Sequence, residues 1–268
     1  MKKRDQGIVL KKSTTVIAIA IISLALFSGC GGDAKSTSIE KSDIKPINVA
    51  AASSFQAAFQ NLAQSFTEET GIKIDFTFGS SGLLARQIEE GAPVDIYASA
   101  SKKYVRDLKK QGLISDEKSV TVNGQLVLIF SEFPEMSLFD LVNANIEKIA
   151  IANPEHAPYG AAAKDLLENT GLWDSIKDKL VYGNNVVQTT QFVSSKNADA
   201  GIVSISHAAA SGFEWEVIDE DLYDPIEQPI VIVEESTNKD AAKEFISYLS
   251  KGDGKQKLED YGLGVEDE

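Results

Sequence analysis

Short apolar runs alternate with longer amphipathic stretches over most of this chain, and this alternation limits the folds open to it. Residues 47–52 form a short, mostly apolar run that is typical of a buried strand. Residues 55–69 then carry apolar side chains at helical spacing and stop before Gly71, and glycine commonly closes a helix. Residues 72–78 place isoleucine or phenylalanine at every second position, as a strand with one buried face does. This order predicts an α/β fold in which helices cover a parallel sheet.

The same alternation continues to residue 249. We expect further strands at residues 94–98, 125–130, 149–152, 181–182, 200–204 and 228–234. We expect further helices at residues 83–90, 104–111, 161–170, 187–197 and 239–249, followed by an acidic tail. The folded part from Pro46 onward has roughly 220 residues, which is more than a typical single domain.

We therefore expect two α/β lobes joined by two crossover segments. The chain is predicted to cross to the second lobe near residues 121–125 and to return near residues 223–228. The first lobe then comprises residues 46–122 and 228–268, and the second lobe comprises residues 123–227. Two crossovers form a hinge, and a hinge between two lobes permits closure on a ligand.

Residues 1–29 have the layout of a signal peptide. Basic residues precede an almost uninterrupted apolar run at residues 16–27, which is short for a permanent membrane span. The run leads into a Ser-Gly-Cys sequence that resembles the bacterial lipobox, in which the cysteine, here Cys30, is lipidated and becomes the mature N-terminus. Residues 30–45 are rich in small and polar residues and are predicted to form a flexible stalk. These features predict an extracytoplasmic protein anchored to the membrane through Cys30, and the alternative is a plain N-terminal anchor helix with an incidental cysteine.

Charge and residue counts argue against several kinds of function. The formal net charge is −14, and residues 1–29 hold five basic residues and one acidic residue, so the chain from Cys30 onward carries −18. Nucleic acid is therefore not expected as a partner. A single cysteine and two histidines, His156 and His207, provide neither a disulfide nor a metal site. We expect His156 to position its loop and His207 to lie at the start of a helix.

Catalytic patterns are also missing from the sequence. It has no Gly-x-Ser-x-Gly elbow, and no candidate nucleophile has a base beside it. We therefore expect neither an enzyme nor a cofactor. Arg86 is expected to pair with Glu89 or Glu90 along its helix, and Trp173 and Trp215 are expected to anchor helix packing.

Small polar residues follow four of the predicted strands and precede the next helix. These turns contain residues 53–54, 80–82, 158–160 and 184–186. In a parallel sheet such turns lie at the carboxyl ends of the strands, where ligands usually bind. The free N–H groups of a helix start and the hydroxyl groups of serines bind anions without a cationic side chain. Each serine alone would be interpreted as a helix cap, but four such turns predict an anion site made of uncharged donors.

At these turns the sequence resembles the periplasmic molybdate-binding protein family, the receptor of the molybdate ABC transporter. The resemblance spans nearly the whole folded part and is carried by residues 50–55, 78–93, 153–160 and 199–203. It implies the type II periplasmic-binding-protein fold, in which two α/β lobes bury one tetrahedral oxyanion between them.

The resemblance also implies a set of ligand contacts. The two serine ligands of the family correspond to Ser54 and Ser81. Its two backbone donors correspond to Tyr159 and Val186. Ser53 and Ser80 are neighbours that could also contribute. Molybdenum would be held only as the oxyanion and not as a bare metal ion. Many members have a tyrosine after the Gly-Ile-Val segment, where this chain has Ser204, and the shorter side chain of serine puts that contact in doubt.

The function implied is capture of molybdate or tungstate by a monomer and delivery to the permease of an ABC importer. Molybdate and sulfate are fully deprotonated dianions at neutral pH and only accept hydrogen bonds, which suits neutral donors. Monohydrogen phosphate would need an acceptor, and the four turns contain no carboxylate; Asp95, nearby in sequence, is interpreted as structural. The alternatives are a receptor for another oxyanion such as sulfate, or an enzyme on the same two-lobed fold.

Overall fold

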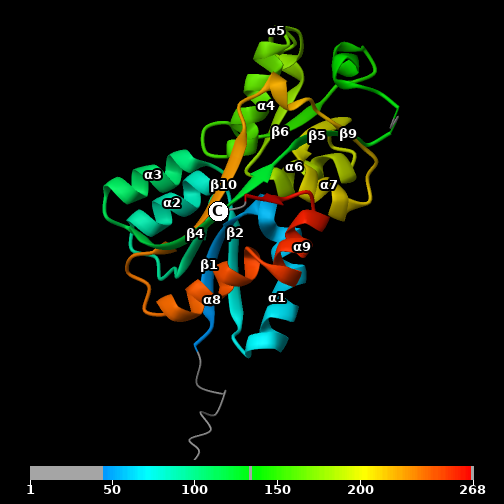
Figure 1. The fold of residues 1–268 in the computed structure, drawn as a ribbon. Coiled ribbons are helices and arrows are strands. Elements are labelled where there is room, and N and C mark those ends of the chain that lie inside the picture. Colours follow the sequence, from blue (N-terminus) through cyan, green and yellow to red (C-terminus); the bar gives the residue numbers. More distant parts are fainter. Residues whose placement is uncertain (1–44, 133–134, 267–268) are drawn as a thin grey trace, which may run out of the picture. The chain divides into compact units, whose positions relative to one another are not determined.

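The computed structural model describes residues 45–132 and 135–266 (Figure 1). The predicted signal peptide, Cys30 and nearly all of the predicted stalk lie outside the described residues. In the two described ranges, no helix is both long enough and apolar enough to cross a membrane.

The strands of the described residues form two separate sheets. One has the order β11-β4-β10-β3-β1-β2, and the other has the order β7-β6-β8-β5-β9. The strands of the first sheet are β1 (Ile47–Ala52), β2 (Ile74–Gly79), β3 (Ile96–Ala98), β4 (Ile114–Gly124), β10 (Ile226–Val233) and β11 (Gly264–Val265). The strands of the second sheet are β5 (Leu126–Phe130), β6 (Ile149–Ala152), β7 (Leu180–Gly183), β8 (Ala200–Ser204) and β9 (Trp215–Val217). We call each sheet with its helices a lobe, lobe 1 for the first sheet and lobe 2 for the second.

Helices pack on both sheets, which confirms the predicted α/β fold with two lobes (Figure 1). The helices of lobe 1 are α1 (Gln56–Thr70), α2 (Ser81–Glu89), α3 (Lys102–Lys110), α8 (Lys239–Leu249) and α9 (Gly252–Asp260). The helices of lobe 2 are α4 (Pro158–Asn169), α5 (Trp173–Ile176), α6 (Val186–Ser194) and α7 (Ile205–Ser211). The 3-10 helices are η2 (Ser53–Phe55), η3 (Leu138–Val142), η4 (Lys177–Lys179) and η5 (Glu220–Leu222).

Strand β1 is apolar along most of its length because both faces of the lobe 1 sheet are covered. Val49 and Ala51 belong to one hydrophobic cluster, whereas Ala50 packs on the other face with Leu84 of α2 and Leu108 of α3. β1 pairs in parallel with β2 and β3, and in lobe 2 β6 pairs in parallel with β7 and β8. Parallel pairing places the carboxyl ends of neighbouring strands at the same edge of each sheet.

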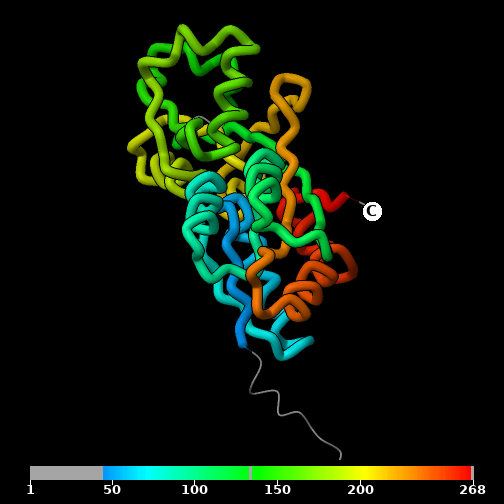
Figure 2. The backbone as a smooth tube through the Cα atoms, turned by 90° about the vertical axis from the view of Figure 1, so that its left-hand side faces the viewer, coloured from blue at the N-terminus to red at the C-terminus, as the bar shows by residue number. Residues whose placement is uncertain are grey.

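The two connections between the lobes lie side by side, where the chain passes between the sheets (Figure 2). β4 ends at Gly124 in lobe 1, and β5 begins at Leu126 in lobe 2. The chain returns after β9 and enters β10 at Ile226, which is paired with Gly124 in an antiparallel register. Gln228 follows two residues later, opposite Val122. The polar side chain of Gln228 is thus placed in the paired strands that join the lobes.

Three features differ from the sequence prediction. β4 begins at Ile114, in a segment without a predicted element, because pairing with β10 holds it extended while its charged side chains face solvent. Trp215 does not anchor helix packing; it lies on the edge strand β9 and its side chain is 41% exposed. The helix expected to be the last is followed by α9, whose buried Leu258 packs in the core that also holds α1 and α8. Tertiary contacts override local pattern in each case.

Two structural interpretations of single side chains are confirmed. Arg86 Nε lies 3.0 Å from Glu90 Oε1 one helical turn away, and because both side chains are exposed this ion pair contributes little to stability. Trp173 begins α5, and the ammonium group of Lys164 from α4 lies 5.5 Å from the centre of its ring. Trp173 therefore joins two helices, as expected.

Phenylalanine rings hold α1 against the sheet and α8. The Phe59 ring lies 4.8 Å from Phe55, 5.7 Å from Phe76 of β2 and 5.8 Å from Phe245 of α8, measured between ring centres. Phe59 is completely buried. A large side chain in such surroundings stabilises the fold through both the burial of apolar area and dispersion contacts.

Replacing Phe59 by alanine is expected to lower the free energy of unfolding by about 3–5 kcal/mol, because the lost ring leaves a cavity among three aromatic neighbours. Urea denaturation followed by circular dichroism measures this change. Phe139→Ala is the matched control, since the Phe139 side chain is 63% exposed, and it should change the free energy of unfolding by less than about 0.5 kcal/mol. Equal losses in the two variants would contradict the assignment of Phe59 to the core.

Candidate anion-binding site

Four turns from the two lobes meet around one small cavity. Its lining residues are Ala52, Ser53, Ser54, Gly79, Ser80, Ser81, Ala100, Ala157, Pro158, Tyr159, Asn185 and Val186. None of these residues carries a charged side chain. The cavity volume is about 10 Å³, close to the space of one water molecule. The lining must therefore move outward to admit a larger solute.

Ser81 is held at the start of α2 by two hydrogen bonds from lobe 1. Its hydroxyl oxygen accepts from the backbone N–H of Ala100 at 2.9 Å, and its carbonyl oxygen accepts from the Tyr97 hydroxyl at 2.7 Å. Among the described residues the Ser81 hydroxyl donates no hydrogen bond of its own. This proton is therefore available for a ligand in the cavity, and the side chain is completely buried.

Ser54 lies in η2, directly after β1, with its hydroxyl turned toward the connection between the lobes. Its Oγ donates to Oε1 of Gln228 at 2.8 Å, and both side chains are buried. Its carbonyl oxygen accepts from the Ser206 hydroxyl of lobe 2. Ser54 is thus bonded to lobe 2 through its backbone and to β10 through its side chain.

Lobe 2 contributes the first turns of two helices. Pro158 is the first residue of α4, where its missing N–H does no harm, and Tyr159 follows. Gly160 is required there, because a Cβ at this position would lie 2.0 Å from the carbonyl oxygen of Ala152. Asn185 caps α6 by accepting from the Gln188 N–H at 3.1 Å, and Val186 is the first residue of that helix. Both helix starts line the cavity, and the first N–H groups of a helix have no partner within it.

The loop before α4 also touches lobe 1 directly. His156 Nδ1 lies 2.9 Å from Ser80 Oγ, and the N–H of Gly82 donates to the His156 carbonyl oxygen at 3.0 Å. These bonds fix the turn of α2 against the loop of lobe 2. His156 therefore positions its loop, as the sequence suggested.

The candidate residues are brought together with one exception. Ser53, Ser54, Ser81, Tyr159 and Val186 all line the cavity. Ser204 does not line it; its hydroxyl lies 3.1 Å from the hydroxyl of Ser206 at the start of α7, and the residue is completely buried.

Sequence reasoning missed two residues at or beside the cavity. Ala100 follows β3, so it obeys the same strand-end rule that revealed the four turns. Gln228 is a completely buried polar residue within the otherwise apolar strand β10. A glutamine inside such a run was a visible signal, because buried amides need hydrogen-bond partners.

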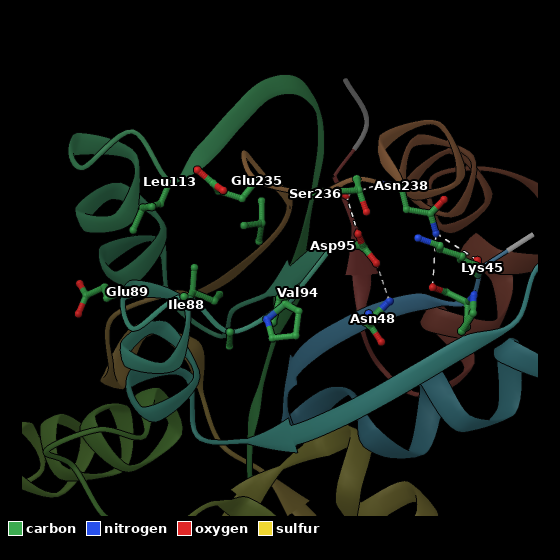
Figure 3. Close-up of a pocket in the computed structure, with 16 residues that line it drawn as sticks. Lys45, Asn48, Ile88, Glu89, Val94, Asp95, Leu113, Glu235, Ser236 and Asn238 are labelled. Carbon is green, nitrogen blue, oxygen red and sulfur yellow. Dashed lines mark hydrogen bonds between the residues drawn. The ribbon is translucent and has the colours of Figure 1, made fainter.

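Asp95 belongs to a different, larger cavity of about 550 Å³ at the amino ends of β1 and β3 (Figure 3). Its carboxylate accepts from the Asn48 N–H at 2.8 Å and from the Ser236 hydroxyl at 2.6 Å. Asp95 thus joins three segments of lobe 1, in agreement with its structural interpretation. Glu89 and Glu235 also line this cavity and outnumber its one lysine, Lys45, so its charge disfavours anions.

Two lobes with paired connections, and a donor-lined cavity where their strand ends meet, define a class of solute-binding proteins that close on a ligand. Residues 47–264 match the family model described as bacterial extracellular solute-binding protein. The chain is 33% identical to the molybdate-binding protein ModA of Azotobacter vinelandii over 82% of this chain and 90% of that protein. It is also 33% identical to YvgL of Bacillus subtilis (strain 168), a candidate ABC transporter substrate-binding lipoprotein, over 95% of this chain and 99% of YvgL.

A solved structure agrees with these matches. The periplasmic molybdate-binding protein of Azotobacter vinelandii superimposes with a TM-score of 0.78 at 28% identity, covering 82% of this chain and 100% of that chain. The chain therefore belongs to the bacterial extracellular solute-binding proteins, in the family of the periplasmic molybdate-binding proteins. It is an extracytoplasmic substrate-binding protein of a transport family and not an enzyme.

His207 in α7 provides a test of burial in lobe 2. Its Nδ1 is buried without a hydrogen-bond partner among the described residues, and burial lowers the pKa of His207 from 6.5 to about 4. In the unfolded chain this imidazole takes up a proton as the pH falls below about 6.5, whereas in the folded chain it does so only near 4. The stability present above pH 6.5 is therefore lost progressively as the pH falls toward 4.

His207→Gln should reduce this pH dependence. We expect the melting temperature of the wild-type protein to fall more than that of the variant between about pH 7.5 and about pH 5, because only the wild type resists protonation when folded. Differential scanning calorimetry at both pH values measures the two changes. The carboxyl groups titrate equally in both proteins. An identical decrease in melting temperature would therefore show that the His207 imidazole is not buried as described.

Proposed function

We propose that this protein captures molybdate or tungstate between its two lobes. The observation that carries the proposal is the composition of the small cavity, in which hydroxyl groups and helix-start N–H groups from four turns converge without any charged side chain. Such a lining offers donors and so suits a fully deprotonated tetrahedral dianion. The contacts proposed are the hydroxyls of Ser54 and Ser81 and the backbone N–H groups of Tyr159 and Val186, with Ser53 as a further donor.

The same lining argues against monohydrogen phosphate. That ion carries a proton and favours a site with a carboxylate acceptor, and no carboxylate lines the cavity. Sulfate has the same charge and shape as molybdate but is smaller, so it is the competing ligand. The ModA relatives, whose name states molybdate binding, support molybdate over sulfate.

We further propose that the protein delivers the oxyanion to the permease of an ABC importer as a membrane-anchored monomer. The similarity to YvgL, named as a substrate-binding lipoprotein, supports both the importer and the anchor. The anchor would be the lipid on Cys30, which follows the predicted signal peptide. A tether at the start of the chain would keep the folded part near the permease while leaving the lobes free to close.

Isothermal titration of the purified protein with molybdate, tungstate, sulfate and phosphate tests the ligand. We expect saturable binding of molybdate and tungstate with one anion per chain, and much weaker binding of sulfate and phosphate. If the protein binds sulfate but not molybdate, the proposed ligand is wrong and sulfate takes its place. No binding of any of the four anions would overturn the oxyanion function itself.

Ser54→Ala and Ser81→Ala are each expected to weaken molybdate binding by roughly 1–3 kcal/mol, because each leaves a buried charged acceptor short of one donor. The same titration measures the loss. Ser115→Ala is the matched control, since Ser115 is a buried serine of β4 outside the cavity lining, and its affinity should equal that of the wild type. If both site variants bind molybdate as tightly as the wild type, the two hydroxyls are not ligand contacts.

Cys30→Ala is expected to release the protein from the membrane. A lipid chain buries many methylene groups in the bilayer at about 0.8 kcal/mol each, and the variant has no thiol to carry it. Expression in a bacterial host, followed by ultracentrifugation and immunoblotting, should place the wild type in the membrane pellet and the variant in the soluble fraction. Equal membrane association would favour the alternative of a plain N-terminal anchor helix.

A further inference from the structure

One residue of lobe 2 is bonded to both chain neighbours of Ser81. The Nδ1 atom of the His156 ring lies 2.9 Å from the Ser80 hydroxyl oxygen. The carbonyl oxygen of His156 accepts from the Gly82 N–H at 3.0 Å. Ser80 and Gly82 belong to the start of α2 in lobe 1, whereas His156 precedes α4 in lobe 2. His156 therefore joins the two lobes at the turn that carries Ser81.

The loop that holds His156 is fixed to lobe 2. Its first residue is Asn153, whose N–H donates at 2.8 Å to the carbonyl oxygen of Gly183 at the end of β7. The carbonyl oxygen of Asn153 accepts from the Ala157 N–H at 2.9 Å, and its side-chain oxygen accepts from the Glu155 N–H at 3.0 Å. Because these bonds close the loop on itself and on β7, His156 moves together with lobe 2.

The turn on the other side is fixed to lobe 1 in the same way. The Ser80 carbonyl oxygen accepts from the Leu84 N–H at 3.1 Å, so Ser80 is part of the first turn of α2. Ser81 accepts one hydrogen bond at its hydroxyl and one at its carbonyl oxygen, both from residues of the β3 segment. The two bonds of His156 thus connect two units that are each held by their own hydrogen bonds, and both must break when the lobes separate.

These bonds also lie far from the strands that connect the lobes. In the sheet of lobe 1, β3 and β1 separate β2 from the connecting strand β10. At the usual spacing of neighbouring strands, the turn after β2 is roughly 14 Å from β10. A rotation about the hinge displaces a distant contact more than a near one, so the bonds of His156 respond strongly to the angle between the lobes.

A second interlobe bond shows the contrast. The Ser206 hydroxyl of lobe 2 donates to the carbonyl oxygen of Ser54 in lobe 1. The residue before it, Ile205, donates through its N–H at 3.0 Å to the carbonyl oxygen of Gln125, which lies between β4 and β5. The Ser206 bond is therefore beside the crossover, where a hinge rotation moves atoms least.

We propose that His156 is a positioning residue that latches the two lobes together over the anion and so slows the release of the anion. The proposal rests on the proposed oxyanion function. His156 does not line the cavity, so it acts without touching the ligand. It fixes the separation of two proposed contacts, because Ser81 lies between its two partners and Tyr159 follows it by three residues. Ser80 serves as the side-chain partner of the latch and not as a ligand contact.

The first test is a double-mutant cycle between His156→Ala and Ser80→Ala. Release of radiolabelled molybdate is followed by filter binding after addition of excess unlabelled molybdate. Each single variant is expected to release the anion about fivefold faster, the effect of one hydrogen bond. The double variant should release it no faster than either single variant, because all three lack the same bond. His156→Asn should restore the slow release, since its amide can place a polar atom near the position of Nδ1.

The second test needs no ligand. Without added oxyanion, hydrogen exchange followed by mass spectrometry reports how often the lobes separate. The Gly82 N–H, which bonds across the lobes, should exchange about fivefold faster in His156→Ala than in the wild type. The Ala100 N–H, which bonds to Ser81 within lobe 1, should exchange equally in both. Ser236→Ala is the matched control, because it removes a serine hydroxyl bond to Asp95 inside lobe 1 and should change neither Gly82 exchange nor molybdate release.

The outcomes separate the latch from the proposed function. If the wild type binds molybdate and His156→Ala releases it at the wild-type rate, the latch is overturned and the oxyanion function stands. A double variant that shows the product of the two single effects would make Ser80 an independent contact and would also overturn the latch. Faster exchange at both Gly82 and Ala100 would show general loosening of lobe 1 and not separation of the lobes. If the wild type binds no oxyanion, the proposed function has failed, and the exchange of Gly82 alone decides whether His156 holds the lobes together.

Discussion

The N–H groups at the first turns of helices, which have no partner within their own helix, are the constraint around which this protein is organised. The segments that follow strands β1 and β2 of lobe 1 and β6 and β7 of lobe 2 all line one cavity. Buried donors need acceptors, and an acceptor-only solute can supply them without a cationic side chain. This explains how the proposed anion site fits a chain of net charge −14, since donors act at contact distance whereas distant surface charges are screened by salt.

The paired strands that connect the lobes place a buried polar side chain beside this cavity. β4 and β10 run antiparallel between the lobes and bring Gln228 beside Ser54 of lobe 1 and Tyr159 of lobe 2. Buried polar groups are strongly coupled because water is not present to replace a lost partner. Direct bonds such as His156 to Ser80 add to this coupling. The proposed ligand contacts and the interlobe contacts therefore involve the same few side chains, and a change in one is expected to alter the other.

Much of the fold was predictable because its core strands are buried on both faces and its helices have clear apolar stripes. The alternation of strand and helix located β1, α1 and β2 within a few residues of their observed bounds. The elements that the sequence did not predict share a physical cause. β4 carries charged residues that hide its strand pattern, β9 is a short edge strand, and α9 has few apolar side chains of its own. Each of these elements is held by its neighbours, and such contacts leave little trace in local sequence.

The candidate site, like the fold, was predictable from the sequence only in part. The sequence by itself determined which residues end the parallel strands, and the strand-end rule then grouped the four turns, because the edge at which parallel strands end follows from their order along the chain. The family resemblance selected Ser54, Ser81, Tyr159 and Val186 within those turns. Only the tertiary structure decided that Ser204 turns to Ser206 and not to the cavity, and that Gln228 faces Ser54. These contacts join residues by the direction of single side chains across two lobes, which depends on packing and register and has no periodic signal in the chain.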